Sequence, residues 1–184
     1  MTTTAIPGLQ TGTWNIDPSH SEVSFSVRHL MVSKVRGTFR TFGGSITVAD
    51  RFEDSTVNAE IDMTSIDTRD ETRDNHLRTK DFFETESFPT MTYTSTGVRA
   101  HRGDFVVDGT LTLHGVSKPV TLDVEVGGVN GDPWGGTRLG LTATTSINRN
   151  DFGVDIKMPL DGGGVVVGEK ISITLEIEAV LAAA

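Results

Sequence analysis

The sequence contains no cysteine among its 184 residues. Disulfide bridges and metal sites built from thiolates are therefore excluded. Basic residues are also scarce, with 16 Lys and Arg against 25 Asp and Glu, which gives a formal net charge of −9. This balance disfavours a nucleic-acid-binding protein, because neutralising phosphates requires a basic surface. It equally disfavours simple electrostatic adhesion of the whole chain to anionic lipid.

Long apolar runs are absent as well. No stretch approaches the roughly 18 consecutive apolar residues of a membrane-spanning helix. Residues 1–14 contain neither a basic region nor a long apolar region, so they do not resemble a secretory signal. The length fits one domain covering residues 1–184. We therefore expect a single-domain, cytoplasmic protein without a membrane span.

Apolar and polar residues alternate along much of the sequence. A period of two indicates strands with one apolar face that is turned away from water, here called the dry face. In residues 20–31 the dry row contains Val23, Phe25 and Val27, then continues through His29 to Met31. The glycine pair at 43–44 predicts a bulge or bend within a longer strand. Strands are predicted at residues 14–17, 22–31, 35–39, 46–48, 57–63, 91–94, 105–113, 120–126, 139–147 and 171–177.

About eight strands, several of them long, fit either a two-layer sandwich or a closed antiparallel barrel. Segment 20–31 alone would span roughly 35 Å or more, whereas common strands have about six residues. Strand length therefore favours an all-β, eight-stranded antiparallel barrel. A barrel of this size has an interior that can hold one small ligand.

Residues 68–83, TRDETRDNHLRTKDFF, break the alternation and are rich in charged, helix-tolerant residues. We expect a short helix or helical turns here, held to the body by Leu77, Phe82 and Phe83. The insert could cap one mouth of the barrel or form a solvated connection, and the sequence leaves both open.

Sequence motifs for catalysis or metal binding are weak. Segment 162–170, GGGVVVGEK, approximates a phosphate-binding loop but has Glu and Lys where that motif needs Lys and Ser or Thr. A turn or flap is the better interpretation. The histidines show no HxH or HExxH spacing, and no G-x-S-x-G elbow is present. The residues thus suggest a container more than a catalyst, with no metal and no cofactor.

Two polar residues adjoin the dry rows. His29 shares a face with Phe25 and Val27, so its ring needs a partner, either a protein group such as Tyr93 or a ligand oxygen. Arg149 follows the row 139–147 within INRNDFG, where it could lie near a barrel rim or reach a ligand head group.

Four segments in order resemble the YceI-like family of lipid-binding barrels. They are TWNIDPSHSEVSFSVRHL…VRGTFRTFGGSI (13–46), RDNHLRTKDFFETESFPTMTYTST (73–96), GTLTLHGVSKPVTLDVEV (109–126), and INRNDFG (147–153) with VVVGEKISITLEIEA (165–179). The resemblance implies an extended, lipocalin-like barrel whose apolar tunnel binds a polyisoprenoid or similar long-chain lipid. Many members of that family are exported to the periplasm and some form homodimers.

The resemblance and the residue pattern together predict a non-catalytic lipid carrier. Each methylene moved from water to an apolar wall contributes about 0.8 kcal/mol to the binding free energy, so an apolar tunnel is enough to bind a long hydrocarbon tail. The expected ligand-binding residues are Val27, His29, Phe39, Ile61, His76, Met91, Tyr93, Leu111, Leu113, Leu141, Arg149 and Ile173. Two alternatives remain open: a barrel enzyme that uses interior His and Arg on a small hydrophobic substrate, and an interaction module with a solid core.

Overall fold

Antiparallel strands account for most of residues 6–156 and 166–184, the part of the chain that the computed structural model describes. The strands are β1 (Gly12–Ile16), β2 (Glu22–His29), β3 (Ser33–Phe39), β4 (Phe42–Val48), β5 (Thr56–Asp62), β6 (Ile66–Asp67), β7 (Thr90–His101), β8 (Asp104–Leu113), β9 (Val116–Gly131), β10 (Thr137–Asn148) and β11 (Val167–Leu181). The helical elements are α1 (Glu71–Leu77) and the 3₁₀ turns η1 (Pro18–His20), η2 (Phe52–Asp54), η3 (Met63–Ser65) and η4 (Arg149–Phe152).

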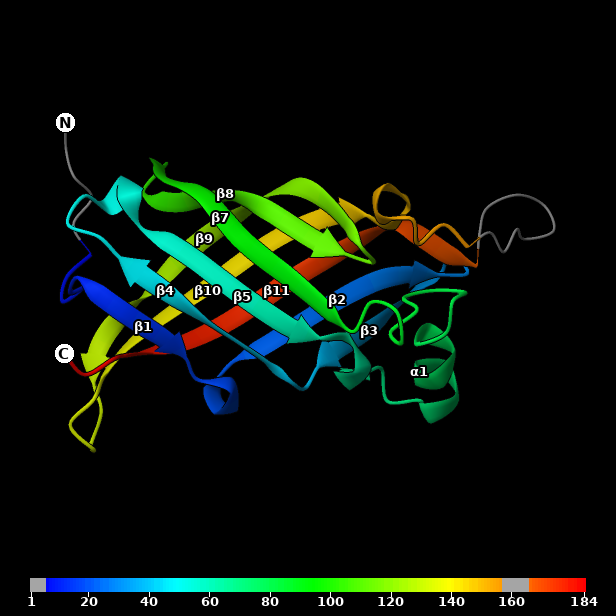
Figure 1. Cartoon of the computed structure of the whole chain (residues 1–184), viewed down its shortest axis with the longest axis horizontal. Coiled ribbons are helices and arrows are strands. Elements are labelled where there is room, and N and C mark those ends of the chain that lie inside the picture. The colour runs from blue at the N-terminus through cyan, green and yellow to red at the C-terminus, as the bar shows by residue number, and fades with distance from the viewer. Residues whose placement is uncertain (1–5, 157–165) are drawn as a thin grey trace.

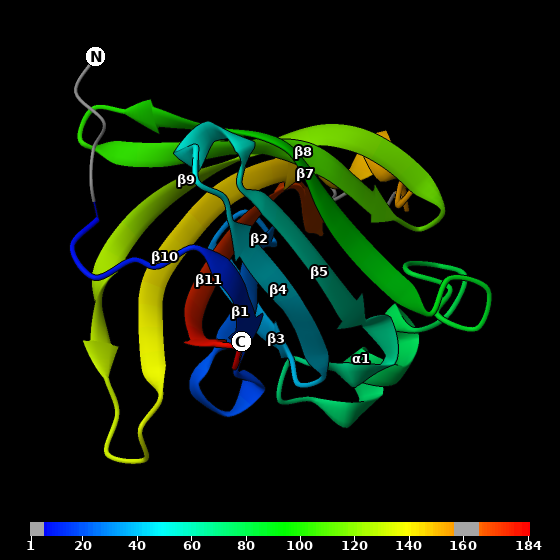
Figure 2. The ribbon, with the colours of Figure 1, turned by 60° about the vertical axis from the view of Figure 1, so that its left-hand side comes forward.

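The strands form one sheet that closes on itself (Figures 1 and 2). The closed ring follows the order β1-β4-β5-β7-β8-β9-β10-β11, and β11 pairs back with β1. One edge of β11 pairs with β1 and, further along, with β2, so β2 continues the place of β1 in the ring. In the same way β3 continues the place of β4, and β6 continues the place of β5. The predicted eight-stranded antiparallel barrel is therefore confirmed, with three of its strands each broken into two segments.

The barrel closes around Trp14. Its backbone pairs with Leu181 on one side and with Ile46 on the other. The indole ring is fully buried, and its Nε1 donates a hydrogen bond to the Gln10 carbonyl oxygen at 3.0 Å. Closure pairs both edges of β1, which removes an open sheet edge at this seam and with it a site for strand-to-strand aggregation.

The second predicted strand, residues 22–31, is shorter in the structure than the sequence pattern suggests. β2 ends at His29, and residues 30–32 form the turn into β3. The Val32 amide donates to the His29 carbonyl at 3.1 Å, and the two central residues, Leu30 and Met31, have φ of 51° and 59°. The assignment of Met31 to the dry face was wrong, because the turn lifts its side chain out to solvent.

The predicted bend at the glycine pair was also misplaced. The chain breaks between β3 and β4 at residues 40–41, and Gly43 and Gly44 lie inside β4. A Cβ on Gly44 would come within 2.2 Å of the Asn58 carbonyl oxygen on β5. That glycine therefore permits close approach of two strands rather than a change of direction.

The charged insert folds into α1 and the loop that follows it. Asp70 caps the helix by accepting a hydrogen bond from the Arg73 amide at 2.9 Å. Asp74 is buried and accepts from the Thr68 amide and hydroxyl at 2.9 and 2.5 Å. None of the helices in the described ranges has the length and apolar character that crossing a bilayer requires. The predicted short helix is confirmed.

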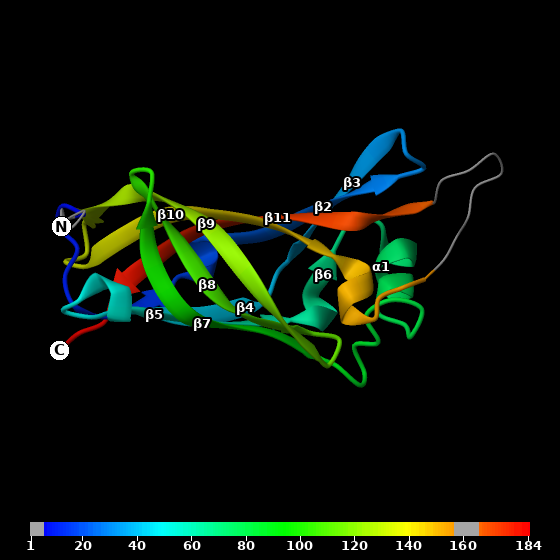
Figure 3. The ribbon, with the colours of Figure 1, turned by 90° about the horizontal axis from the view of Figure 1, so that it is seen from above.

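The barrel has two distinct ends along its long axis (Figures 1 and 3). The helix end carries α1, η4 and the β2–β3 turn. The terminal end carries η2, the β9–β10 turn and the C-terminal residues of β11. The long strands β9, β10 and β11 run between the two ends and separate them.

Candidate functional site

The inner faces of the strands enclose a large cavity towards the terminal end, with a volume of about 170 Å³. Its wall is built from alternate residues of successive strands, as the period of two requires. Ile6, Leu9 and Phe52 lie across its end. The strand residues of its wall include Ile46, Val57, Ile61, Met91, Tyr93, Val107, Leu111, Leu122, Val124, Leu139, Leu141, Ala143, Ile173 and Leu175.

A second, small cavity of about 90 Å³ lies towards the helix end. Side chains of the insert line it, namely Leu77, Phe82 and Phe83. The insert therefore covers this end of the interior, which favours the predicted cap over a solvated connection. Its other lining residues include Phe25, Val27, Phe39, Met63, Leu113, Ile147, Arg149, Val154, Val167 and Ile171.

The two cavities adjoin, because Val23, Met91 and Ile173 line both. Protein interiors are normally close-packed, with few voids larger than a water molecule. An apolar cavity of about 150 Å³ is already large enough to hold a benzene molecule. The apolar inner faces of this barrel therefore surround an empty space along its axis instead of filling it.

Ten of the twelve predicted ligand-binding residues line these cavities. Ile61, Tyr93, Leu111 and Leu141 line the large cavity, Val27, Phe39, Leu113 and Arg149 line the small one, and Met91 and Ile173 line both. His29 and His76 line neither. His29 is the last residue of β2, beyond Val27 and past the cavity end. His76 is exposed on α1, where Nε2 lies 2.8 Å from Asp81 Oδ2.

Tyr93 is held by the barrel wall. Its hydroxyl donates towards the Val120 carbonyl at 2.9 Å, with the Val107 carbonyl at 3.3 Å. Gly109 makes room for the ring, since a Cβ there would lie 2.5 Å from the hydroxyl oxygen. Burial, with a smaller contribution from the charge of Asp108, raises the pKa of Tyr93 to about 12. Tyr93 is therefore a neutral, satisfied wall residue, and the suggested contact with His29 is not present.

Among the described residues that line the two cavities, Arg149 alone has a charged side chain. The side chain is buried, and burial lowers the pKa of its guanidinium. Its donors point to five acceptors, four of which are backbone carbonyls. The bonds to Val154 and Ile156 on one side and to Val167 and Gly168 on the other join the residues that flank segment 157–165.

Sequence patterns did not find the residues that close the two cavity ends. Phe52 lies in η2, and Val154 lies in irregular chain after η4, so neither belongs to a strand. Phe52 is an isolated apolar residue in a polar loop, whereas the only signal for Val154 is its short alternation with Phe152 and Ile156. Residues 162–165 of the glycine-rich segment 162–170 lie outside the described residues, so the turn or flap proposed there stays a prediction, whereas residues 167–170 begin β11.

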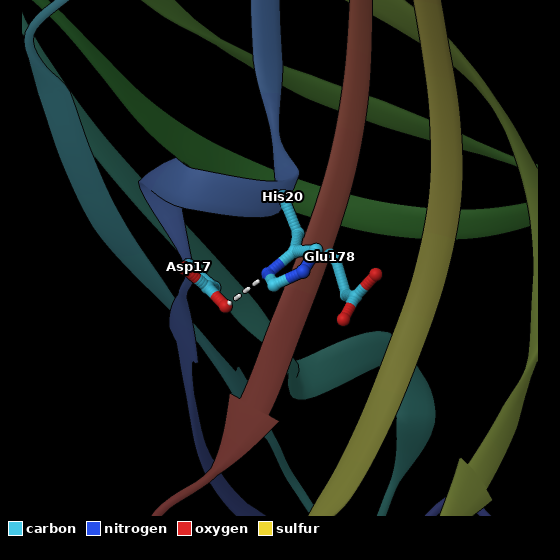
Figure 4. A group of neighbouring side chains, drawn as sticks. All are labelled: Asp17, His20 and Glu178. Carbon is cyan, nitrogen blue, oxygen red and sulfur yellow. Dashed lines mark hydrogen bonds and ion pairs between the residues drawn. The ribbon is translucent and has the colours of Figure 1, made fainter. Parts of the chain in front are cut away.

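A cluster of potential metal ligands lies on the outer surface, where Asp17, His20 and Glu178 come together (Figure 4). His20 Nδ1 lies 2.9 Å from Asp17 Oδ2. Arg138 Nη1 donates to Asp17 at 2.8 Å and to Glu178 at 2.7 Å. The cation between the two carboxylates is thus a guanidinium, and the cluster is an ion-pair network that ties β1, β10 and β11 together.

The family model for the YceI-like domain matches residues 14–179, which is nearly the whole barrel. The chain belongs to the YceI-like family. Protein YceI of Escherichia coli is 42% identical over 136 residues, which cover 73% of this chain and 71% of that protein. This YceI-like chain therefore shares both its sequence motifs and its closed barrel with that family.

Solved structures agree with the barrel. BcnA of Burkholderia cenocepacia superimposes with a TM-score of 0.76 at 22% identity, covering 89% of this chain and 98% of BcnA. A polyisoprenoid binding domain from Saccharophagus degradans, implicated in plant cell wall breakdown, gives 0.71 at 17% identity, covering 94% of this chain and all of that domain. At these identities the likeness establishes the fold of this YceI-like barrel.

Proposed function

We propose that this protein binds, and carries or stores, a polyisoprenoid or related long-chain lipid inside the barrel. An isoprenoid quinone, a prenyl alcohol and a prenyl phosphate all belong to this ligand class. The observation that carries the proposal is the pair of adjoining apolar cavities along the barrel axis. The polyisoprenoid binding domain of Saccharophagus degradans, which has the same fold, supports the choice of lipid class.

The energetics favour an apolar tail in this space. On the scale of about 24 cal/mol per Å³, filling a cavity of 170 Å³ recovers roughly 4 kcal/mol of packing energy. Each buried methylene adds about 0.8 kcal/mol from removal of apolar surface from water. Met91, at the junction of the two cavities, suits branched chains because its thioether side chain is flexible.

The head group of the lipid is proposed to lie at the helix end, near Arg149. Arg149 forms no salt bridge within the described part of the chain, and the carboxylates of Glu169 and Asp155 act on it only at longer range. A buried charge of this kind attracts an anionic or strongly polar group. The guanidinium need not release its backbone carbonyls to act in this way, because its positive charge is not neutralised by them.

A carrier fits this interior better than an enzyme does. Proton-transfer catalysis needs a polar group that can exchange a proton with the substrate. Tyr93 is held neutral by its raised pKa and bonded to wall carbonyls, and the donors of Arg149 are occupied. The proposal therefore assigns no catalytic residue. A cytoplasmic location and a homodimer stay predictions.

Organic extraction of the purified protein, followed by mass spectrometry, tests the proposal. We expect a prenyl lipid in stoichiometric amount, or uptake of added prenyl lipid by the extracted protein together with a rise in melting temperature. A clean extract combined with no uptake of prenyl alcohols of any length would contradict the proposal.

A matched pair of variants on β11 sharpens this test. Ile173→Trp places bulk at the junction of the two cavities and should abolish uptake of long prenyl chains. Ser172→Trp adds the same side chain to the exposed, outward face of the same strand and should leave uptake unchanged. Equal uptake by both variants would show that the lipid does not thread the junction.

A further inference from the structure

The β2–β3 turn exposes three consecutive apolar side chains to solvent. Leu30, Met31 and Val32 are 40%, 54% and 80% exposed. Figure 3 shows the hairpin of β2 and β3 standing away from β11 at the helix end. Large exposed apolar groups that gather at one place on a soluble surface mark an interaction site more often than isolated ones do.

Basic side chains flank this apolar tip. From Val23 to Ala49 the chain contains no Asp or Glu, although it has 25 acidic residues in all. Arg28, Lys34 and Arg36 are exposed, and none of them forms a salt bridge with another described residue. Arg40, further from the tip, pairs with Asp67. The hairpin is thus a local cationic region on an acidic protein.

Several residues of this hairpin are unfavourable for the stability of the hairpin itself. Leu30 and Met31 occupy the two left-handed positions of a tight turn, which Asn-Gly fills with far less strain. Arg28 lies directly opposite Lys34 in the strand register, and like charges at such a pair destabilise a hairpin. An anionic partner that accepts apolar groups would offset the repulsion between Arg28 and Lys34 and would give Leu30 and Met31 a contact surface that a turn of Asn and Gly would lack.

The hairpin also lies beside the small cavity. His29 pairs with Val167, which lines that cavity and accepts a hydrogen bond from Arg149. The nearest charges on the adjoining strand β11 are Glu169 and Lys170, which cancel. The net charge of −9 therefore describes the whole chain but not this edge of the helix end.

We propose that the β2–β3 hairpin is a membrane-docking element for an anionic phospholipid bilayer. The tip of Leu30, Met31 and Val32 enters the interface between head groups and acyl chains. Arg28, Lys34 and Arg36 pair with lipid phosphates. Docking in this way turns the helix end of the barrel towards the bilayer, where an apolar cargo would enter or leave. The docking does not require the proposed cargo, whereas its role in lipid exchange rests on the proposed function.

Flotation of the full chain with vesicles tests the docking. Vesicles of phosphatidylcholine alone are compared with vesicles that contain phosphatidylglycerol, and neither contains a prenyl lipid. We expect binding only to the anionic vesicles at low salt, with loss of binding at high salt. Arg28→Gln with Lys34→Gln should weaken binding about 25-fold, since each basic residue near an anionic surface contributes about fivefold.

A second variant removes two of the three apolar side chains of the tip while keeping the fold. Leu30→Asn with Met31→Gly installs the preferred turn residues, so the hairpin should gain stability and still lose vesicle binding. The control is Trp134→Ser at the β9–β10 turn, where a side chain that is 79% exposed lies at the other end of the barrel. That control should bind as the unmodified chain does.

Three outcomes would overturn the docking proposal. They are no binding to anionic vesicles, unchanged binding by both hairpin variants, or equal loss in the Trp134→Ser control. Binding of an acidic protein at the hairpin without any binding of vesicles would also overturn it. Because the vesicles carry no prenyl lipid, these outcomes are independent of whether organic extraction finds a cargo.

Discussion

The two ends of β10 each carry an arginine, and the two arginines have opposite surroundings. Arg138, at the terminal end, is paired with carboxylates of Asp17, Asp132 and Glu178 at 2.7–2.8 Å. Arg149, just past the helix end of the strand, is buried and donates mainly to backbone carbonyls. One cation is neutralised on the outer surface, while the other keeps its charge at the wall of a cavity.

Arg138 therefore has a structural role, whereas the charge of Arg149 is available to attract a ligand. The carboxylates, chiefly Asp17, raise the pKa of Arg138, whereas burial lowers the pKa of Arg149. The Arg138 network joins three strands and completes the barrel at one end. At the opposite end, a buried cation that forms no salt bridge with another described residue lies beside the capped mouth of the cavity and the exposed basic hairpin. We therefore expect the ligand to enter and leave the barrel at the helix end.

The largest effect should come from removing Arg149. Arg149→Leu leaves four buried carbonyls without their donors, so we expect a loss of about 3 kcal/mol in the free energy of unfolding. Urea denaturation of the purified variant measures the loss. Arg138→Leu, at the more exposed network, is the matched control and should lose clearly less. Equal losses would remove the distinction between the two ends.

Tyr93, between the two ends, should show a smaller and purely structural effect. Tyr93→Phe removes the hydroxyl that satisfies the Val120 carbonyl, which should cost about 1–2 kcal/mol while leaving prenyl-lipid uptake intact. The pKa of Tyr93 is raised from 10.0 to about 12, so the folded protein holds a proton that the unfolded chain releases. This contribution is complete below pH 10 and is lost as the pH rises towards 12.

Denaturation as a function of pH checks the second part of that prediction. The unmodified chain should lose stability between pH 10 and 12 more steeply than Tyr93→Phe does. Loss of lipid uptake by Tyr93→Phe would instead assign the hydroxyl to the head group of the lipid.

The preference of the protein for a charged over an uncharged lipid head group also tests the difference between Arg149 and Arg138. Arg149→Gln should lower the affinity for a prenyl phosphate about tenfold more than for the uncharged prenyl alcohol, the scale of one attraction between nearby opposite charges. Arg149→Lys, which keeps the charge, should retain most of the preference for the phosphate. Titration of both ligands by intrinsic fluorescence or calorimetry provides the affinities. An unchanged ratio in Arg149→Gln would place the head group elsewhere.

The smallest effect should appear at acid pH in the Arg138 network. Hydrogen bonds from Ser19, then Arg138 and His20, hold the pKa of Asp17 well below 3.8. A lowered pKa contributes stability above pH 3.8 that is lost as the pH falls below it. Arg138→Leu should therefore flatten the decline of stability between pH 4 and 2. An identical decline in both proteins would show that the network contributes nothing measurable.

Sequence periodicity was enough to predict the barrel and most of its wall. Rows such as Leu111 and Leu113 on β8 face inward because side chains alternate strictly along a strand. Met31 was misjudged, since periodicity does not show where a strand stops and a turn begins. His29 is still in the strand but is not among the residues that line the cavities, whose length periodicity does not show. Phe52 and Val154 were missed because they come from loops, whose positions depend on the elements they connect.

The alternation of residues alone determined an all-β chain with one apolar face per strand, because a pleated strand can present a row of alternate side chains in no other way. Only the tertiary structure decided that these faces enclose two adjoining cavities and that Arg149 points into one of them. The reason is physical: the width left inside a ring of strands depends on how the ring closes and on which loops fold over its ends.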